Sequence, residues 1–214
     1  MNRKNDILEE YNSWSKSYDN DSNPTRDLDS LAVSQNSQRY KAKRIIEIGC
    51  GTGKNTTILA EIGSSVHALD FSPGMIEIAR KKLSSKDNVE FTITDIRQKW
   101  PLEDKSADVI TCSLVLEHIE NLEFIFSEAN RILMDSGEFF ISELHPYRQY
   151  QGKKANYIRN NEKIEITAYK HDVSEFVNTA IDHHFKLERI DELHDENDTQ
   201  TVPRLITFIF KKLK

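Results

Sequence analysis

One stretch of this sequence decides the fold: Ile45-Ile46-Glu47-Ile48-Gly49-Cys50-Gly51-Thr52-Gly53-Lys54. Its first four residues have the β-branched density of a buried parallel strand. Its three glycines let the chain turn sharply and bring its backbone against a ligand before a helix begins at Asn55. A carboxylate, Asp70, follows one strand later. The pattern predicts a turn that binds a nucleoside.

The spacing of the glycines indicates which ligand this turn binds. In the dinucleotide fingerprint the third glycine comes three residues after the second, where it lets helix and strand pack. Here that position is Lys54, and the glycine comes one residue earlier, at Gly53. A phosphate-binding P-loop is disfavoured too, because no Gly-Lys-Ser/Thr ends the run. A nucleotide-dependent oxidoreductase with NAD or FAD is therefore the less favoured interpretation.

The pattern Glu47-x-Gly49-x-Gly51-x-Gly53 resembles motif I of the class I methyltransferases that use S-adenosylmethionine (SAM). The resemblance covers residues 45–146, with four motifs in register, and extends more weakly into both flanks. It implies an α/β fold in which a single domain, residues 1–214, forms a Rossmann-like, seven-stranded, mostly parallel sheet. It also implies transfer of a methyl group from SAM to an acceptor by in-line displacement.

Composition narrows the class of acceptor. The 214 residues carry a net charge of -6, which provides no general field for binding nucleic acid, so a small molecule is expected. No apolar run is long enough to span a bilayer, and the N-terminus lacks the apolar segment of a signal peptide, which predicts a cytoplasmic protein. Cys50 and Cys112 are expected to be reduced and structural. The seven histidines show no ligand spacing, so no metal is predicted.

The flanks of the central sheet are predicted to shape the site. Residues 1–40 are expected to form a helical lid, in which Leu8, Tyr11, Trp14, Ser15 and Tyr18 lie at helical spacing. A second helix is expected from Arg26 to about Gln38, with Thr25 as its cap. An insertion over residues 145–172 is predicted to follow the fifth strand and to contain a hairpin of segments 155–159 and 163–169.

Strands and helices alternate between these flanks. The predicted strands span residues 45–48, 66–69, 89–93, 109–112 and 138–144, and the predicted helices span 55–62, 73–83 and 121–134. Ser72 followed by Pro73 is typical of a helix start. A helix over 173–183 and strands over 185–192 and 204–211 are predicted to complete the domain.

The resemblance assigns the SAM site residue by residue. Glu47 would hold the ligand's ammonium through water, and the backbone from Gly49 through Cys50 and Gly51 to Gly53 would admit its methionyl and ribose parts. Asp70 would accept both ribose hydroxyls, as a carboxylate at this position does in dinucleotide folds as well.

Further along the chain, the resemblance assigns the adenine and the methionine end. Asp95 would accept from the adenine amino group, while the backbone amide of Ile96 meets a ring nitrogen. Phe71 and Met75 would line the adenine face, with core packing as the open alternative. The backbone near Cys112 and Ser113 would contact the methionine end.

Methyl transfer needs alignment more than it needs a base. An acceptor that loses a proton would nevertheless need a base, and His118, His145 and Glu143 are predicted to lie near the sulfonium at the carboxyl edge of the sheet. The lid resembles that of the ubiquinone and menaquinone C-methyltransferases, and places Tyr18 where its ring would attract the sulfonium.

The lid and the insertion also hold the residues suited to binding an acceptor. Arg26 would anchor a carboxylate of SAM or of the acceptor. The remaining candidates are aromatic and basic: Tyr11, Trp14, Tyr147, Arg148 and Tyr157. Because no residue is uniquely demanded by methyl transfer, a non-catalytic module that binds SAM or a partner is the open alternative.

Overall fold

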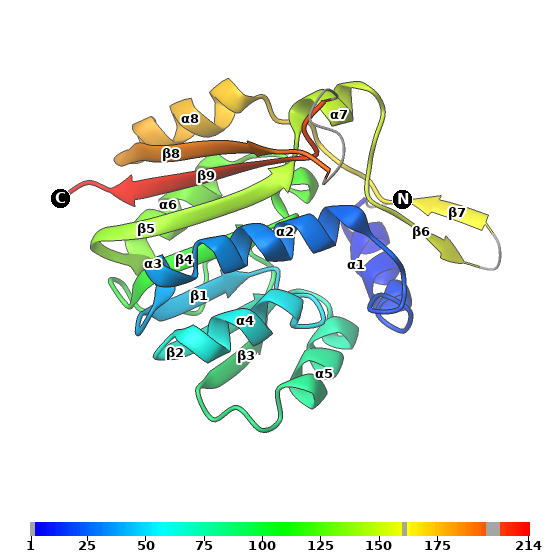
Figure 1. Cartoon of the computed structure of the whole chain (residues 1–214), viewed down its shortest axis with the longest axis horizontal. Coiled ribbons are helices and arrows are strands. Elements are labelled where there is room, and N and C mark those ends of the chain that lie inside the picture. Colours follow the sequence, from blue (N-terminus) through cyan, green and yellow to red (C-terminus); the bar gives the residue numbers. More distant parts are fainter. Residues whose placement is uncertain (1–2, 160–161, 196–201) are drawn as a thin grey trace.

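The protein folds around one twisted sheet with helices on both faces (Figure 1). The structure is a computed structural model and describes residues 3–159, 162–195 and 202–214. Within these residues, seven strands form the sheet in the order β3-β2-β1-β4-β5-β9-β8. β9 is the one strand of this sheet that runs opposite to the other six, so the predicted Rossmann-like, mostly parallel sheet is confirmed.

The strands of this sheet are β1 (Arg44–Ile48), β2 (Ser65–Asp70), β3 (Val89–Ile93), β4 (Ala107–Ser113), β5 (Leu133–Leu144), β8 (Phe185–Leu193) and β9 (Leu205–Lys212). The helices before β5 are α1 (Arg3–Trp14), α2 (Pro24–Gln35), α3 (Ser37–Tyr40), α4 (Lys54–Ile62), α5 (Pro73–Lys82), a 3-10 turn η1 (Leu116–His118) and α6 (Glu123–Ile132). After β5 come α7 (Pro146–Tyr150), the hairpin β6 (Asn156–Arg159) and β7 (Glu162–Glu165), and α8 (Val173–Asp182).

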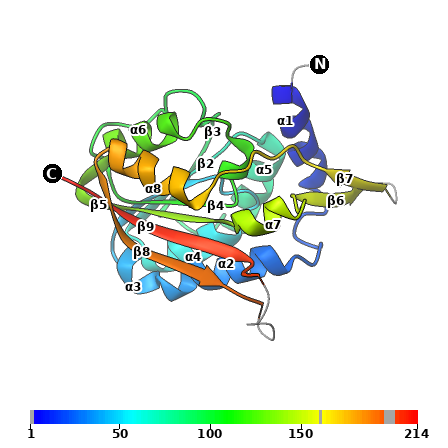
Figure 2. The same ribbon diagram turned by 90° about the horizontal axis from the view of Figure 1, so that it is seen from above.

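Alternate side chains of the strands enter two cores, one on each face of the sheet. Ile46 and Ile48 of β1 pack with α6 and α8, whereas Ile45 packs with α2, α3, α4 and α5. Figure 2 shows α6 and α8 on the face opposite α2 and α4. Strand order reverses between β1 and β4, and in open α/β sheets ligands bind outside the carboxyl ends of the strands at such a point.

Several predicted helix boundaries are wrong, each for a local reason. The second helix is capped by Asn23 rather than Thr25, because the Asn23 side chain accepts from the backbone N–H groups of Thr25 and Arg26. It ends at Gln35, and a separate turn, α3, follows. The predicted helix over 121–134 ends at Ile132, since Leu133 already pairs with Ala107 in the sheet.

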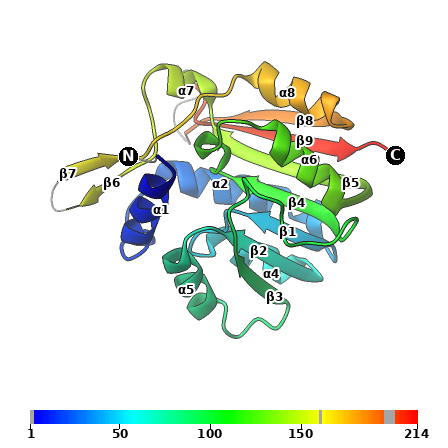
Figure 3. The ribbon, with the colours of Figure 1, turned by 180° about the vertical axis from the view of Figure 1, so that it is seen from behind.

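The lid and the insertion form one structural unit beside the sheet. The indole of Trp14 stacks on the ring of Tyr157 in β6, with centroids 5.0 Å apart, and the Tyr157 hydroxyl donates to Glu10 at 2.5 Å. Figure 3 shows the β6–β7 hairpin and α1 together at one end of the molecule. The predicted hairpin is confirmed, but the insertion also contains the short helix α7, and α1 ends before Tyr18, which lies in the following turn.

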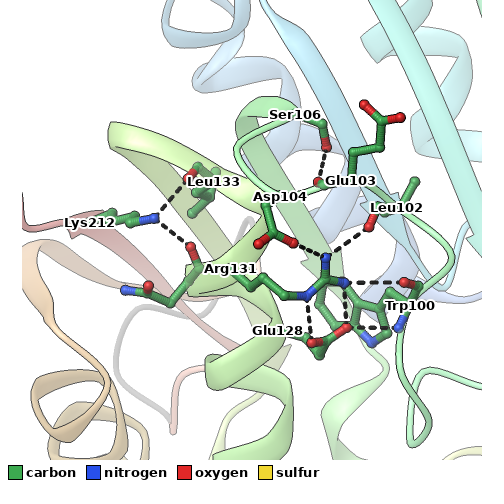
Figure 4. Close-up of polar contacts among 10 residues, drawn as sticks. Trp100, Leu102, Glu103, Asp104, Ser106, Glu128, Arg131, Leu133 and Lys212 are labelled. Carbon is green, nitrogen blue, oxygen red and sulfur yellow. Dashed lines mark hydrogen bonds and ion pairs between the residues drawn. The ribbon is translucent and has the colours of Figure 1, made fainter.

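A different network ties α6 to the amino edge of the sheet (Figure 4). The Arg131 guanidinium donates to Glu128 and Asp104, and to the carbonyls of Trp100 and Leu102, at 2.6–3.1 Å. Residues 100–104 precede β4, so Arg131 fixes the edge of the sheet opposite the carboxyl ends. The carboxyl ends remain available for a site.

Candidate functional site

A cavity, here called the inner cavity, lies between α1 and the carboxyl ends of β1, β2, β3 and β4. Its volume is about 90 Å³. Its walls are Ile7, Tyr11, Tyr18, Gly49, Gly51, Asp70, Phe71, Met75, Thr94, Asp95, Ile96, Arg97, Ser113, Leu114, Val115, His118 and Ile119. Ten of the predicted site residues are therefore brought together here.

The glycine turn after β1 needs glycine at each of its three positions. Gly49, Gly51 and Gly53 have φ values of 69°, 53° and 81°, which favour residues without a Cβ. A Cβ on Gly49 would lie 2.1 Å from Val115 Cγ2, whereas a Cβ on Gly51 would meet nothing within 4 Å. Gly53 instead faces Leu83 at the end of α5 and does not line the cavity, so its predicted contact with the ligand is replaced by helix packing.

Asp70 is held by the backbone at the end of β2. One of its carboxylate oxygens accepts from the N–H of Gly51 at 2.9 Å, and the other accepts from the N–H of Ser72 at 2.8 Å. Burial raises the pKa of Asp70 to about 6, although these backbone donors favour the charged form. Each oxygen keeps a further acceptor position, so the carboxylate is positioned to bind two more donors from the cavity.

Glu47 and Cys50 lie on the far side of the glycine turn. With Gly49, Gly51, Ser113 and Asn55, among others, they line a smaller hollow of about 50 Å³. Glu47 is buried, accepts from the Thr56 hydroxyl at 2.5 Å, and has its pKa raised to about 8 by burial. A carboxyl group with this pKa is mostly neutral at pH 7.

The opposite wall of the inner cavity contains the predicted adenine residues. Phe71, Met75 and Ile96 line it, and Asp95 lies beside them. Sequence reasoning missed Arg97, whose guanidinium holds both carboxylate oxygens of Asp95, at 2.7 and 2.9 Å. An amino group that binds Asp95 must therefore share this carboxylate with Arg97.

The segment after β4 closes the cavity in a strained conformation. Leu114 has a φ of 56°, which is costly for a residue with a branched side chain. Glu143 of β5 holds the next residues, because its Oε1 accepts from the N–H groups of Val115 and Leu116 at 3.0 and 2.7 Å. Ser113 lines the cavity, but Cys112 is fully buried in the core and does not. Glu143, expected among the bases, thus serves as an anchor for this loop.

Glu143 gives the protein a pH-dependent stability. Burial, reinforced by Glu117, raises its pKa to about 8, so the folded state retains a proton that the unfolded chain loses near 4.5. The stability that protonated Glu143 contributes is fully present below about pH 4.5 and is lost as the pH rises toward 8. In Glu143→Gln the side-chain amide oxygen can still accept from the two backbone N–H groups, but the side chain carries no charge. The melting temperature of this variant should therefore exceed that of the wild type, by a margin that grows from pH 5 to 8.5.

The matched control for this prediction is Glu120→Gln, which removes an exposed carboxylate from the same region. Thermal melts of the three proteins across that pH range give the comparison. Parallel curves for Glu143→Gln and the wild type would contradict the assignment.

His118 is held between two partners at the boundary of the cavity. Its Nδ1 lies 2.8 Å from the carbonyl of Thr167, which only accepts, so Nδ1 carries the hydrogen. The neutral ring then accepts at Nε2 from the hydroxyl of Tyr11, at 2.7 Å. Glu117 lies 3.9 Å from Nε2. Tyr11 and His118 both line the inner cavity, and the Tyr11 hydroxyl occupies the Nε2 acceptor position of His118.

Tyr18 lies against a buried cation. The Arg26 guanidinium sits 4.0 Å from the centroid of the Tyr18 ring and donates to the backbone carbonyls of Tyr18 and Asp21. Burial raises the pKa of Tyr18 to about 12. One face of the ring is thus covered by Arg26, and only the other face is available for the predicted contact with a sulfonium.

The structure separates His145 from the other predicted catalytic residues. Its Nδ1 caps α7 by accepting from the N–H of Tyr147 at 3.2 Å, and its Nε2 lies 3.0 Å from Glu192 of β8. It lines neither the inner cavity nor the outer cavity described next. Its prediction as a base is therefore corrected: the imidazole has both nitrogens engaged in structural contacts.

A second space, here called the outer cavity, lies between the lid and the insertion and has a volume of about 370 Å³. Its walls are Tyr11, Trp14, Tyr18, Ser22, Asn23, Pro24, Thr25, Arg26, Leu114, Glu117, Leu144, Arg148, Lys153, Lys154, Ala155, Asn156 and Arg204. The two cavities share Tyr11, Tyr18 and Leu114 as walls. A molecule in the outer cavity would lie next to one in the inner cavity.

Two further features concern the chain as far as the structure describes it. None of the helices in this part combines the length and apolar content that crossing a bilayer requires. Cys50 and Cys112 are buried and unpaired, in line with their predicted reduced state.

Comparison with known proteins identifies the domain. A family profile described as a methyltransferase domain matches residues 46–141. Over 107 residues the chain is 31% identical to the demethylmenaquinone methyltransferase of Tropheryma whipplei, covering 50% of this chain and 44% of that protein. Over 103 residues it is 29% identical to the ubiquinone biosynthesis O-methyltransferase of Xanthomonas oryzae, covering 48% and 43%.

The fold extends this similarity beyond the matched segment. The structure of DhpI in complex with SAH aligns with a TM-score of 0.74 at 18% identity, covering 97% of this chain and 95% of that one. The chain spans less than half the length of the two curated relatives, and the segment that the family profile matches includes the glycine turn and Asp70. Residues 46–141 thus match a methyltransferase domain, and the surrounding sheet has the fold of the solved SAM-dependent methyltransferase structures.

Proposed function

We propose that this protein binds SAM in the inner cavity and transfers its methyl group to a small molecule bound in the outer cavity. The observation that carries the proposal is Asp70. Its carboxylate is fixed by the Gly51 and Ser72 amides and lines a cavity whose walls also include Gly49 and Gly51 of the glycine turn. A ribose diol supplies two donors at the spacing that one carboxylate accepts.

The remaining walls fit the other parts of SAM. Phe71, Met75 and Ile96 offer an apolar slot for the adenine, with Asp95 at its edge. The methionine end would extend toward the hollow beside Glu47 and Cys50. Bound there, SAM would supply a methyl group on a positive sulfur, which needs no metal or further activation.

The residues around the shared wall would align the reactants and exclude water. Tyr11, Tyr18 and Leu114 border both cavities, so an acceptor in the outer cavity would approach along one direction. In-line displacement depends on such alignment and on exclusion of water. These three side chains would provide both.

An acceptor that loses a proton would lose it through Tyr11. As the new bond to carbon forms, the acceptor's proton would pass to the Tyr11 oxygen while the Tyr11 hydrogen passes to His118 Nε2, 2.7 Å away. The resulting imidazolium would be stabilised by the Thr167 carbonyl at Nδ1. His118 would thus act through Tyr11 rather than by direct contact.

The overall proposal is tested by binding and turnover. Calorimetry with the full chain should detect SAM and SAH and give no signal with NAD, and tritiated SAM with a panel of small hydroxyl and amine acceptors should give labelled product. Binding of NAD without binding of SAH would refute the proposal. Binding of SAH with no turnover on any acceptor would favour the non-catalytic module.

Tyr11→Phe tests the proton path once the screen has identified an acceptor. Loss of the hydroxyl should lower kcat by about 100-fold, the lower range for general base catalysis, with little change in the Kd for SAH. His118→Asn should do the same, and the pH profile of kcat should lose its acidic limb in both variants.

Tyr147→Phe is the control for this pair, because Tyr147 is exposed and lines neither cavity. A Tyr11→Phe enzyme with the kcat and pH profile of the wild type would remove Tyr11 from the proton path.

A further inference from the structure

The outer cavity gathers positive charge in a chain that is negative overall. The whole sequence has 35 acidic and 29 basic residues, with a net charge of -6. The cavity wall nevertheless contains five cations and a single carboxylate, that of Glu117. The cations are Arg26, Lys153, Lys154, Arg148 and Arg204. This reversal of sign points to a ligand that carries negative charge.

Arg26 is a buried cation that lacks a carboxylate partner among the described residues. It is 8% exposed, and its two terminal nitrogens donate to the carbonyls of Tyr18 and Asp21, at 2.5 and 2.7 Å. Its Nε has no hydrogen-bond partner within the described part of the chain. A buried charge is costly unless it is paired, so an anion beside Arg26 would be stabilised strongly.

Arg148 and Arg204 share one counter-ion. Both guanidinium groups bind Asp195, and Arg148 is further fixed by the carbonyls of Val202 and Pro203. Within the part of the chain that the structure describes, one carboxylate balances one of these two cations, which leaves the pair with a net positive charge. The carbonyl contacts also hold Arg148 in place at the cavity wall.

The single carboxylate of the wall offsets little of this charge. Glu117 is 5% exposed, and burial raises the pKa of its carboxyl group, which favours the neutral form. Lys153 and Lys154 are exposed at the mouth of the cavity. An incoming anion would therefore meet cations from the mouth inward to Arg26.

The rest of the wall is suited to a flat molecule. Tyr11, Trp14 and Tyr18 present aromatic rings to the outer cavity. The volume of about 370 Å³ lies at the lower end of the range for sites that bind small molecules. The space therefore fits a compact aromatic compound.

We propose that the acceptor is a small aromatic anion, with a carboxylate or phosphate held by Arg26 and Arg148 and its nucleophile directed toward Tyr11. This inference rests on the proposed function, since it identifies the outer cavity as the acceptor site. The two sources of charge share the same recognition chemistry, and separate probes distinguish them.

The test measures binding to the full chain saturated with SAH. The probes are 3-hydroxybenzoate, phenyl phosphate and the neutral 3-hydroxybenzamide, titrated by calorimetry or ligand-observed NMR at two salt concentrations. One or both anions should bind at least 10-fold more tightly than the amide, and the preference should shrink at high salt. Equal binding of all three probes would overturn the inference.

A charge-matched pair of variants locates the anion. Lys153→Gln/Lys154→Gln removes two cations at the mouth and should weaken binding of the preferred anion by about 3- to 10-fold, as expected for exposed charges. Lys41→Gln/Lys43→Gln makes the same change in net charge on the exposed turn before β1, and should leave binding of the anion unaltered. Equal effects of the two double variants would show that the anion responds only to overall charge, which also overturns the inference.

The same titrations separate the two levels of the argument. Absence of SAH binding would refute the proposed function itself. Normal SAH binding without a preference for anions would refute only the assignment of the acceptor class.

Discussion

Asp70→Ala should weaken binding of SAH by about 100-fold or more. The substitution removes the acceptor for two ribose hydroxyls, and a hydrogen bond to a charged group contributes roughly 1.5–3 kcal/mol. Two such bonds amount to at least about 3 kcal/mol, or two factors of ten in Kd. Because the pKa of Asp70 is raised to about 6, the affinity of the wild type should also fall as the pH drops below 6.

Asp70 also supports the protein itself, so the experiment needs a control on the ligand. Its loss leaves the amides of Gly51 and Ser72 without their acceptor, which would loosen the turn. A cycle with the 2′,3′-dideoxy analogue of SAH separates the two effects. Deleting the diol should cost affinity in the wild type and almost none in Asp70→Ala.

Asp108→Ala serves as the matched protein control. Its carboxylate also accepts a backbone N–H, that of Arg44, at 2.9 Å, but at the amino edge of the sheet. SAH binding should be unchanged in this variant. If the dideoxy analogue loses as much affinity in Asp70→Ala as in the wild type, Asp70 does not bind the diol.

Alanine at Gly51 should mainly weaken ligand binding, whereas alanine at Gly49 should mainly destabilise the fold. At Gly51 the new Cβ meets no protein atom within 4 Å, so only the left-handed backbone costs stability, about 1–2 kcal/mol. The methyl group would nevertheless occupy the space into which the ligand approaches the backbone. We expect a folded Gly51→Ala protein with SAH affinity reduced by about 100-fold or more, equivalent to roughly 3 kcal/mol.

At Gly49 the defect should lie in the fold. The new Cβ would lie 2.1 Å from Val115 Cγ2, so the loop anchored by Glu143 must move. Such overpacking, added to the backbone strain, costs about 2–5 kcal/mol. Thermal melts should therefore show a loss of about 5–15 °C for Gly49→Ala and a smaller loss for Gly51→Ala.

Gly152→Ala provides the control for backbone strain alone. Gly152 has a φ of 80°, a Cβ there would meet nothing within 4 Å, and it lines neither cavity. It should lose stability like Gly51→Ala but bind SAH normally. Native SAH affinity in Gly51→Ala would mean that the ligand does not approach this backbone.

Elements whose chemistry is local were predictable from the sequence. The glycine turn, the Asp70 carboxylate and the Ser72 cap each depend on neighbouring residues, and β3 has the predicted bounds. Errors arose where two local signals competed. Asn23 and Thr25 both suit a cap, and the choice falls to Asn23 because Pro24 occupies the first helical position.

The arrangement of the site depended on contacts that no local pattern encodes. Tyr11 and His118 are 107 residues apart, so their hydrogen bond follows from how α1 docks on the sheet. The prediction that His145 lies at the carboxyl edge missed its role in capping α7, a helix too short to show periodicity. The role of Glu143 could not be predicted either, because its carboxylate binds backbone N–H groups of Val115 and Leu116, which are distant in sequence.

The position of α1 has a consequence for the order of events in turnover. Asn12 of α1 accepts from the Ser72 hydroxyl and from the Gly74 amide, both of which follow Asp70 in the sequence. Trp14, at the end of α1, stacks on Tyr157 of the hairpin. The inner cavity has a volume of about 90 Å³ and is bordered by α1 as well as by the sheet edge, α5 and η1, so a withdrawal of α1 would enlarge it for a nucleoside. That withdrawal would open the outer cavity as well, because both cavities share Tyr11 and Tyr18. Exchange of the spent nucleoside and retention of the acceptor would then be mutually exclusive, which gives the catalytic cycle a compulsory order, with the donor first on and its product last off.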